Sequence, residues 1–242
     1  PNAIRARSTA RKRLYLALLE GRNLKHAASL HYTSAEERVL AAESGIRTRG
    51  FVVPNGLDLA AFPSAKRGQR DGADSDPTVL FLGRIVPKKG LDLLLPAFAQ
   101  TVSERPDARL MLAGPDNDGY LSTVMGLIRH HNLQDSVRYV GMLVGEEKLE
   151  ALRNAAFLVL PSYSENFGMV VIEALACQTP VVVSDRVNIW AQVVKAGAGL
   201  VASCDITSLA SAMLEMLKNP SRIQEMGKKG RELVEREFTW DG

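Results

Sequence analysis

Two stretches of the sequence carry side chains suited to binding an anion. The first is GRIVPKKG at residues 83–90, where Arg84 and Lys89 surround a turn and Gly90 opens a predicted helix. A helix N-terminus favours negative charge because its first backbone N–H groups have no partner within the helix. Arginine can bind a diphosphate as a fork and lysine as a point charge, and Gly83 allows a close backbone approach. This stretch predicts a phosphate site; a solvated basic turn is the alternative.

The second stretch is SENFGMVVIEALAC at residues 164–177, which places two acidic side chains eight positions apart. Glu165 lies in a predicted loop, and residues 166–169 are expected to form the first turn of the next helix. The free N–H groups of that turn suit an anion or a hydroxyl. Glu173 follows on an otherwise apolar helix. Because an unpaired buried carboxylate is costly, it needs ribose hydroxyls or a nearby cation, unless it faces solvent at the sheet edge.

Acidic and histidine groups elsewhere could hold a metal ion, but simpler roles explain them better. Asp74-Ser75-Asp76 falls in a polar linker, and Asp116-Asn117-Asp118 falls in a turn-rich GPDNDG segment, where acidic residues commonly shape or solvate loops. His130 and His131 are neighbours near the end of a predicted helix, so their side chains point about 100° apart. We therefore expect no metal site.

Regular alternation of strands and helices positions the two stretches. After a polar segment at 64–77, which we expect to be a mobile linker or loop, six apolar strands alternate with helices. This pattern predicts an α/β fold, a Rossmann-like parallel sheet with helices on both faces, whose ligands bind beyond the carboxyl ends of the strands. The expected strands are 78–83, 108–114, 136–141, 156–161, 180–184 and 199–203, and the expected helices are 90–103, 120–131, 146–154, 169–177, 206–218 and 221–237.

The part before the linker is shorter and more basic. It predicts a helix over about 9–30, a short strand at 30–34, and a strand at 51–54. Between the two strands, Ser34 and Glu37 have the spacing of a capping box at the start of a helix. Residues 1–50 carry ten Lys/Arg against four Asp/Glu. Their basic cluster could touch acidic phospholipid or nucleic acid, but a solvated helix start is the preferred interpretation, since no aromatic residues are interleaved.

Composition excludes several classes of protein. With 242 residues, 46% of them hydrophobic and 24% charged, the chain is too apolar to be disordered. Its cysteines are Cys177 and Cys204, too few for a disulfide scaffold and without the Cys/His spacing of a zinc site. No apolar run approaches the ~18 residues of a membrane helix, and no signal peptide opens the chain. The expected compartment is the reducing cytosol.

Four motifs resemble, in order, those of retaining glycosyltransferases of the GT-B fold, the large family 4 in particular. The motifs are VVPNGLDLAAF (52–62), FLGRIVPKKGLDLLLPAF (81–98), PSYSENFGMVVIEALACQTPVVVSD (161–185) and EREFTW (235–240). The resemblance implies a Rossmann-like donor-binding domain over 55–242. It makes residues 1–54 a remnant of the N-terminal, acceptor-side domain together with the interdomain segment.

The same resemblance implies a role for each candidate residue. Arg84 and Lys89 would contact the diphosphate of a nucleotide-sugar donor, Glu165 the transferred sugar, and Glu173 the ribose hydroxyls. Arg84, Lys89 and Glu165 would thereby take part in the transfer itself. The remaining donor contacts would be Gly83, Gly114 at the end of the second strand, Leu143 in the loop 141–144 against the base, and the N–H groups of Asn166, Phe167, Gly168 and Met169.

The implied activity is transfer of a sugar from a UDP-, GDP- or ADP-sugar, with retained anomeric configuration, to a saccharide or lipid-linked acceptor. No metal or other cofactor is implied, because the Arg/Lys pair and a helix N-terminus would offset the charge of the leaving nucleotide. The acceptor would bind the N-terminal domain, so this chain is expected to bind donor weakly and transfer nothing alone. Nucleic acid is not an expected partner. Peripheral attachment to the inner face of the plasma membrane is common among such cytoplasmic enzymes.

Two other functions stay open. A sugar-nucleotide epimerase can share the GT-B architecture, but it needs acid–base residues in the cleft, and the sequence offers no convincing set beyond the glutamates. A non-catalytic nucleotide-sugar-binding module would have a vestigial site. The presence of Arg84, Lys89, Glu165 and Glu173 argues against such decay.

Overall fold

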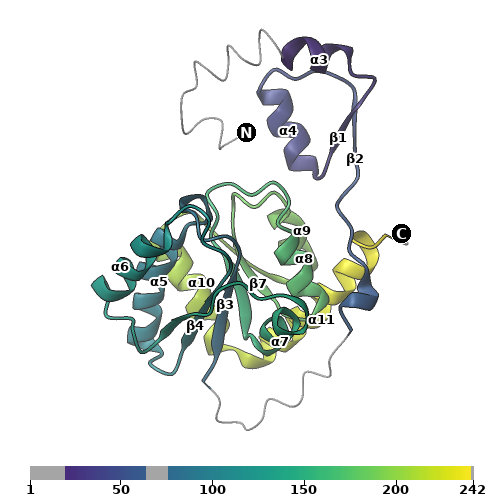
Figure 1. Cartoon of the computed structure of the whole chain (residues 1–242). Helices are drawn as coiled ribbons and strands as arrows, with labels where there is room; N and C mark the ends of the chain where they lie inside the picture. Colours follow the sequence, from purple (N-terminus) through teal and green to yellow (C-terminus); the bar gives the residue numbers. More distant parts are fainter. Residues whose placement is uncertain (1–19, 64–75, 241–242) are drawn as a thin grey trace.

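The computed structural model describes residues 20–63 and 76–240, which form an N-terminal segment and a larger α/β domain (Figure 1). The first half of the predicted helix at 9–30, the basic cluster at 5–13 and nearly all of the predicted linker at 64–77 lie outside these residues. Within the described ranges, no helix combines the length and hydropathy needed to cross a bilayer.

The elements follow the predicted order, and in the α/β domain the bounds of the predicted elements shift by at most two residues. The strands are β1 (Leu30–Tyr32), β2 (Gly50–Val52), β3 (Thr78–Leu82), β4 (Arg109–Ala113), β5 (Val137–Tyr139), β6 (Phe157–Leu160), β7 (Val181–Ser184) and β8 (Gly199–Ala202). The helices are α3 (Gly21–His26), α4 (Ala35–Glu43), α5 (Leu91–Glu104), α6 (Leu121–His130), α7 (Gly145–Asn154), α8 (Met169–Ala176), α9 (Trp190–Ala196), α10 (Ile206–Lys218) and α11 (Pro220–Glu237), with 3-10 turns η2 (Leu59–Ala61) and η3 (Pro87–Lys89).

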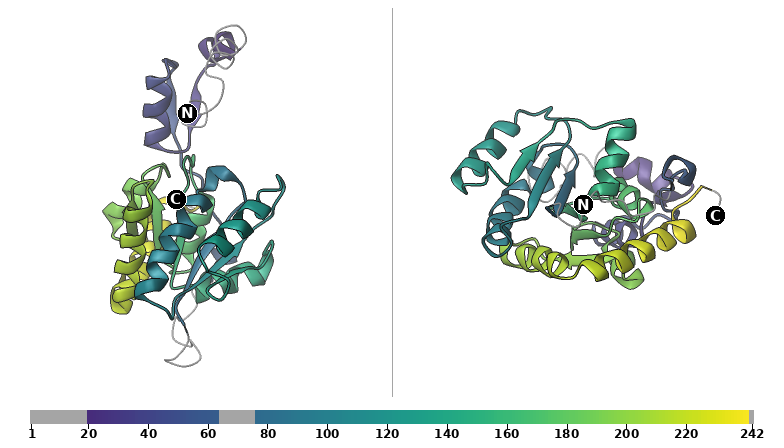
Figure 2. Two further views of the ribbon diagram at one scale, coloured as in Figure 1. Left: turned by 90° about the vertical axis from the view of Figure 1, so that its left-hand side faces the viewer. Right: turned by 90° about the horizontal axis from the view of Figure 1, so that it is seen from below.

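The α/β domain is built on a six-stranded parallel sheet in the order β5-β4-β3-β6-β7-β8. Its strands β3, β6 and β7 are short apolar runs that are almost wholly buried, as expected when helices cover both faces. Figure 2 shows these helical layers on either side of the sheet. The predicted Rossmann-like α/β fold is confirmed.

The strand order reverses between β3 and β6, which are neighbours in the sheet. At such a switch point the connections leaving the two strands run to opposite sides, and a crevice opens beyond their carboxyl ends. The loop after β3 is the basic stretch at 83–90, and the loop after β6 holds Glu165. Topology therefore brings the two predicted stretches to one place.

The N-terminal segment stands at the end of the α/β domain where β3 finishes (Figures 1 and 2). Its strands β1 and β2 form a separate two-stranded parallel sheet beside α4. Ser34 caps α4 by accepting from the backbone N–H of Glu37 at 3.0 Å, so the predicted N-cap is confirmed. The Glu37 carboxylate in turn accepts from the backbone N–H of Thr33 at 2.7 Å. In a standard capping box it would accept from the N-cap residue itself, which is one residue later.

Two local predictions were wrong. Helix α8 begins at Met169, so residues 166–168 lie in the preceding loop and not in the first helical turn. Gly168 ends that loop in a left-handed conformation with φ of 81°, which a helical residue cannot adopt. Helix α9 was not predicted at all, because seven residues without a side-chain N-cap give too little periodicity to recognise.

Candidate functional site

Lys89 and Glu165 meet at the switch point of the sheet. The Lys89 Nζ donates to the Glu165 carboxylate in a direct ion pair, although the two residues are 76 positions apart. The side chains are only 14% and 18% exposed, so water screens this pair less than a surface pair. The structure thus places a cation from the first predicted stretch against an acid from the second.

The loops carrying this pair are joined at further points. Gly90 has φ of 73°, and a Cβ atom there would lie 2.1 Å from the Pro161 carbonyl oxygen, so only glycine allows this approach. The Tyr163 backbone N–H donates to the Lys88 carbonyl at 3.0 Å, and its hydroxyl donates to Asp92 Oδ2 at 2.9 Å. Burial, together with the Asp92 carboxylate, raises the pKa of Tyr163. These contacts hold the two loops in register.

Glycines line the carboxyl ends of β3, β4 and β5. Gly114 donates its N–H to Gly141 at 2.7 Å, and a Cβ on Gly114 would lie 1.9 Å from the Gly83 carbonyl oxygen. A Cβ on Gly83 would lie 3.7 Å from Lys89 Cε, so Gly83 faces the stem of that lysine. The Tyr139 hydroxyl closes the row by donating to the Gly114 carbonyl at 2.9 Å. Gly83 and Gly114 therefore leave backbone, without side chains, beside Lys89.

Glu173 forms an ion pair with a lysine. Lys148 on α7 donates to Glu173 Oε1 at 2.8 Å, and the two side chains are 28% and 16% exposed. Of the partners considered for this carboxylate, the structure shows the cation. Lys148 was missed in the sequence, because it lies among Glu146, Glu147 and Glu150 on a charged helix whose composition is typical of a solvated face.

Arg84 and Leu143 take no part in these two ion pairs. Arg84 is exposed and takes part in no ion pair among the described residues. Leu143 packs partly against the core and lines a groove of about 470 Å³ that runs between α7 and the β4–β5 side of the sheet. The groove is also lined by Met111, Arg138 and Met142. It follows the predicted base-binding loop at 141–144.

The residues after Glu165 have different surroundings. Asn166 donates to Glu37 of the N-terminal segment at 2.9 Å. Phe167 is 4% exposed and packs edge-on against Phe238, with ring centroids 5.6 Å apart, so its side chain belongs to the core. Met169 is 39% exposed at the start of α8. Of this group, Asn166 and Met169 are the exposed residues, and Phe167 and Gly168 are buried.

The acidic and histidine residues considered for a metal ion have separate local roles where the structure describes them. Asp116 accepts the backbone N–H of Tyr120 at 2.9 Å, which is the loop role expected for the segment 116–118. His130 and His131 make an edge-to-face contact with ring centroids 4.9 Å apart. Over the described ranges, no three His, Cys, Asp or Glu side chains gather as a metal site would require.

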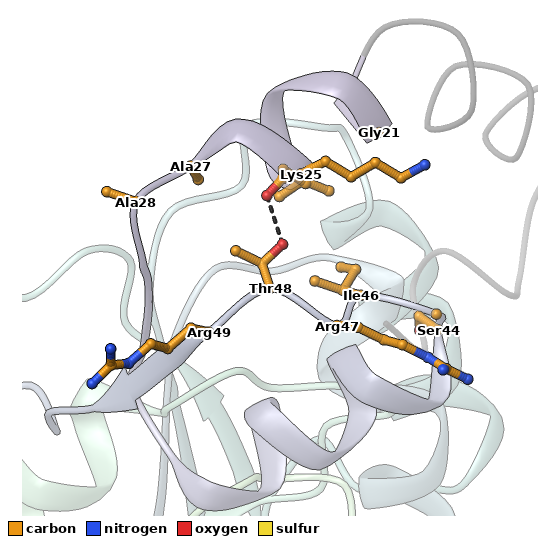
Figure 3. A pocket seen from close by; sticks show the side chains of 11 residues that line it. Gly21, Lys25, Ala27, Ala28, Ser44, Ile46, Arg47, Thr48 and Arg49 are labelled. Carbon is orange, nitrogen blue, oxygen red and sulfur yellow. Dashed lines mark hydrogen bonds between the residues drawn. The ribbon is translucent and has the colours of Figure 1, made fainter.

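A larger cavity, of about 690 Å³, lies in the N-terminal segment and not at the switch point. It is lined by α3, the end of α4 and the turn that follows, with Thr48 Oγ1 donating to the Leu24 carbonyl at 2.6 Å. Figure 3 shows the Lys25, Arg47 and Arg49 side chains extending from it in different directions. The cationic groups do not converge on one point, so this cavity lacks the chemistry of the switch-point loops.

Comparison with known proteins agrees with the motifs. Residues 64–233 match the family described as glycosyl transferases, group 1. The chain belongs to this family. The D-inositol 3-phosphate glycosyltransferase of Kineococcus radiotolerans is 35% identical over 219 residues, covering 81% of this chain and 50% of that protein. The GDP-mannose-dependent monoacylated alpha-(1-6)-phosphatidylinositol monomannoside mannosyltransferase of Corynebacterium glutamicum is 30% identical over 203 residues, covering 78% and 52%.

Solved structures extend the likeness to the N-terminal segment. Sucrose-phosphate synthase from Thermosynechococcus elongatus superposes with a TM-score of 0.85 at 30% identity, over 98% of this glycosyltransferase chain and 60% of that one. Anabaena HepE in complex with UDP and glucose gives a TM-score of 0.81 at 19% identity, over 93% and 63%. These neighbours confirm the GT-B fold. The chain spans about half the length of the curated relatives it matches.

Proposed function

We propose that this chain is the donor-binding half of a retaining glycosyltransferase, which transfers a sugar from a nucleotide diphosphate sugar. The observation that carries the proposal is the Lys89–Glu165 pair at the switch point, where ligands of such sheets bind. Relatives support the donor class: HepE was solved with UDP-glucose, and the C. glutamicum enzyme is named for GDP-mannose. The base stays open among uridine, guanosine and adenosine.

Lys89 and Arg84 would neutralise the donor diphosphate in this proposal. Lys89 is already held beside Glu165, so a bound diphosphate would share its ammonium while Glu165 turns to the hydroxyls of the transferred sugar. Arg84 is exposed at the other end of the same loop and can close on the phosphates as a fork. Stabilising the charge that grows on the leaving nucleotide is an electrostatic contribution to catalysis, for which no metal or cofactor is proposed.

The nucleoside would lie along α8 and α7. Glu173 uses Oε1 for Lys148, which orients the carboxylate and leaves Oε2 to accept from a ribose hydroxyl. The base would lie against Leu143, which lines the groove of about 470 Å³. Gly83, Gly114 and Gly168 would admit the phosphates and sugar close to the backbone, with the N–H groups of Asn166, Phe167 and Met169 nearby.

The acceptor, a saccharide or a lipid-linked sugar, would bind the other half of the full-length enzyme. Residues 1–54 are then the end of that N-terminal domain plus the interdomain segment, and 55–242 the donor domain. On this basis the chain alone transfers no sugar. We also propose a cytoplasmic enzyme, because the described cysteines Cys177 and Cys204 are free thiols. Peripheral contact with the inner face of the plasma membrane is proposed from the family resemblance alone.

Calorimetric titration with UDP, GDP and ADP tests the proposal directly. We expect one of them to bind, and Lys89→Ala to weaken it by about 1–3 kcal/mol, the range for a charged hydrogen bond. Lys88→Ala is the matched control, since this exposed neighbour contacts Tyr163 only through its backbone. Absence of nucleotide binding, or an equal loss in Lys88→Ala, would contradict the site.

Activity assays separate the alternatives. Interconversion of a sugar nucleotide without acceptor would favour an epimerase, and sugar transfer by the 242-residue chain would refute its proposed inactivity alone. The ribose role has its own test: Glu173→Gln should weaken binding of the ribonucleoside diphosphate more than that of its deoxyribose analogue. Equal losses would remove Glu173 from the ribose site.

A further inference from the structure

Glu37 connects the N-terminal segment to the loop that carries Glu165. Its Oε1 accepts from Asn166 Nδ2 at 2.9 Å, across 129 positions of sequence. Its Oε2 accepts from the Thr33 N–H at 2.7 Å and from the Thr33 hydroxyl at 2.8 Å. One carboxylate therefore both closes the start of α4 and reaches the α/β domain.

Hydrogen bonds through Asn166 and Asn188 connect Glu37 to the backbone of Glu165. The Asn166 Oδ1 lies 3.5 Å from Nδ2 of Asn188, a side chain that is 8% exposed in the loop after β7. The Asn188 N–H in turn donates to the Glu165 carbonyl at 3.1 Å, and the Glu165 N–H donates to the Arg186 carbonyl at 3.0 Å. Three segments thus meet on a continuous row of hydrogen bonds that ends at Glu165.

The donors and acceptors in this row are not interchangeable. An ionised carboxylate only accepts, and the Asn166 amide directs its NH₂ group to Glu37 and its oxygen to Asn188. Burial works against ionisation of Glu37, but hydrogen bonds from Thr33 and Asn166 outweigh it and hold its pKa below the usual value. A charged acceptor makes these bonds stronger than neutral ones.

We propose that Glu37 and Asn166 are positioning residues, which fix the loop carrying Glu165 relative to the N-terminal segment. The contact adds to the hydrogen bonds within the α/β domain that keep this loop, and with it Glu165, beside Lys89. This proposal rests on the donor role proposed above for Glu165 and adds a coupling to it. Nucleotide binding in the α/β domain and the placement of the N-terminal segment stabilise one another, since both favour the same arrangement of the loop.

A charge swap across the contact tests the positioning role. Asn166→Asp sets two carboxylates against each other, and we expect amide hydrogen exchange in residues 162–168 to quicken about fivefold, the value of one hydrogen bond. Adding Glu37→Gln to that variant restores a donor facing an acceptor. Exchange should then return to within about twofold of the unmodified chain. Glu36→Gln, an exposed neighbour in the same helical turn, is the control and should leave exchange unchanged.

The outcomes separate this inference from the proposed function. Exchange is measured without ligand, so it tests the link even if no nucleotide binds. Unchanged exchange in Asn166→Asp, no recovery in the double variant, or an equal effect of Glu36→Gln would overturn the positioning role. Where UDP, GDP or ADP binds the unmodified chain, affinity should fall in Asn166→Asp and recover in the double variant, although the introduced carboxylate keeps its charge near the phosphates. A fall without recovery would assign the effect to that charge and contradict the link.

Discussion

The N-terminal segment and the α/β domain are both made of parallel strands and helices, but among the described residues only the α/β domain has an extended core. Its strands β3, β6 and β7 are almost entirely buried, and helices cover the sheet on both faces. In the N-terminal segment before Leu57, which packs into the core of the α/β domain, Tyr32 and Ala41 are the buried hydrophobic residues among those described, while Val39, Phe51 and Val53 are about half exposed. Two-stranded sheets are marginal in water without further packing. Secondary structure alone therefore does not make a folding unit.

The two regions also differ in where the larger cavity lies and where charged groups converge. The N-terminal segment holds the cavity of about 690 Å³, yet its cations diverge. The switch-point loops bring a cation, an acid and closely packed glycines together at the ends of buried strands. A cavity can result from loose packing alone and need not be a ligand site. Convergence of charged groups is therefore the better guide to a site.

Core truncation should separate the two regions most strongly. Phe98→Ala empties a fully buried position on α5 and should lower the free energy of unfolding by about 4 kcal/mol. Phe51→Ala removes a half-exposed ring that stacks on His31 and should cost less than about 1 kcal/mol. Urea unfolding followed by circular dichroism measures both. Similar losses would mean that the N-terminal segment has a core of its own.

A pair of glycine variants isolates the close approach of the two site loops. Gly90→Ala combines a left-handed backbone with a clash at the Pro161 carbonyl, and should cost about 3 kcal/mol. Gly45→Ala has a similar positive φ in the N-terminal segment but no atom within 4 Å of the added Cβ, and should cost about 1 kcal/mol. Equal costs in thermal unfolding would show that backbone conformation, and not loop contact, makes Gly90 necessary.

The ion pair at Glu173 should have a smaller effect. Lys148→Met leaves a carboxylate that is 16% exposed without its cation, which should lower stability by about 1 kcal/mol at neutral pH. Lys229→Met breaks an exposed pair with Glu225 on α11 and should lower stability by less than Lys148→Met does. Raising the salt concentration should reduce the second effect more than the first. The opposite order in urea unfolding would contradict the burial argument.

Much of the α/β domain was predictable because its signals are local. Apolar runs and turn residues placed its six strands, and their alternation with helices implied a parallel sheet. Lys89 and Glu165 could be named in advance because they lie in loops after predicted strands and in motifs of the family, whereas the switch point that joins their loops came from the structure. Helix α9 could not be predicted because it is short and uncapped, and residues 166–168 were assigned to α8 because a left-handed Gly168 leaves no periodic signal.

The amino-acid sequence by itself determined the element order, the fold class, the family and the two loops that carry the candidate site, since periodicity, turn chemistry and motifs act over short stretches. Only the tertiary structure decided that Lys148 neutralises Glu173 and that Glu37 reaches Asn166. Lys148 and Glu37 lie in helix turns with several charged residues, a composition that is typical of a solvent-exposed face. Pairing depends on which faces the packed strands bring together, and that is a property of the folded chain as a whole.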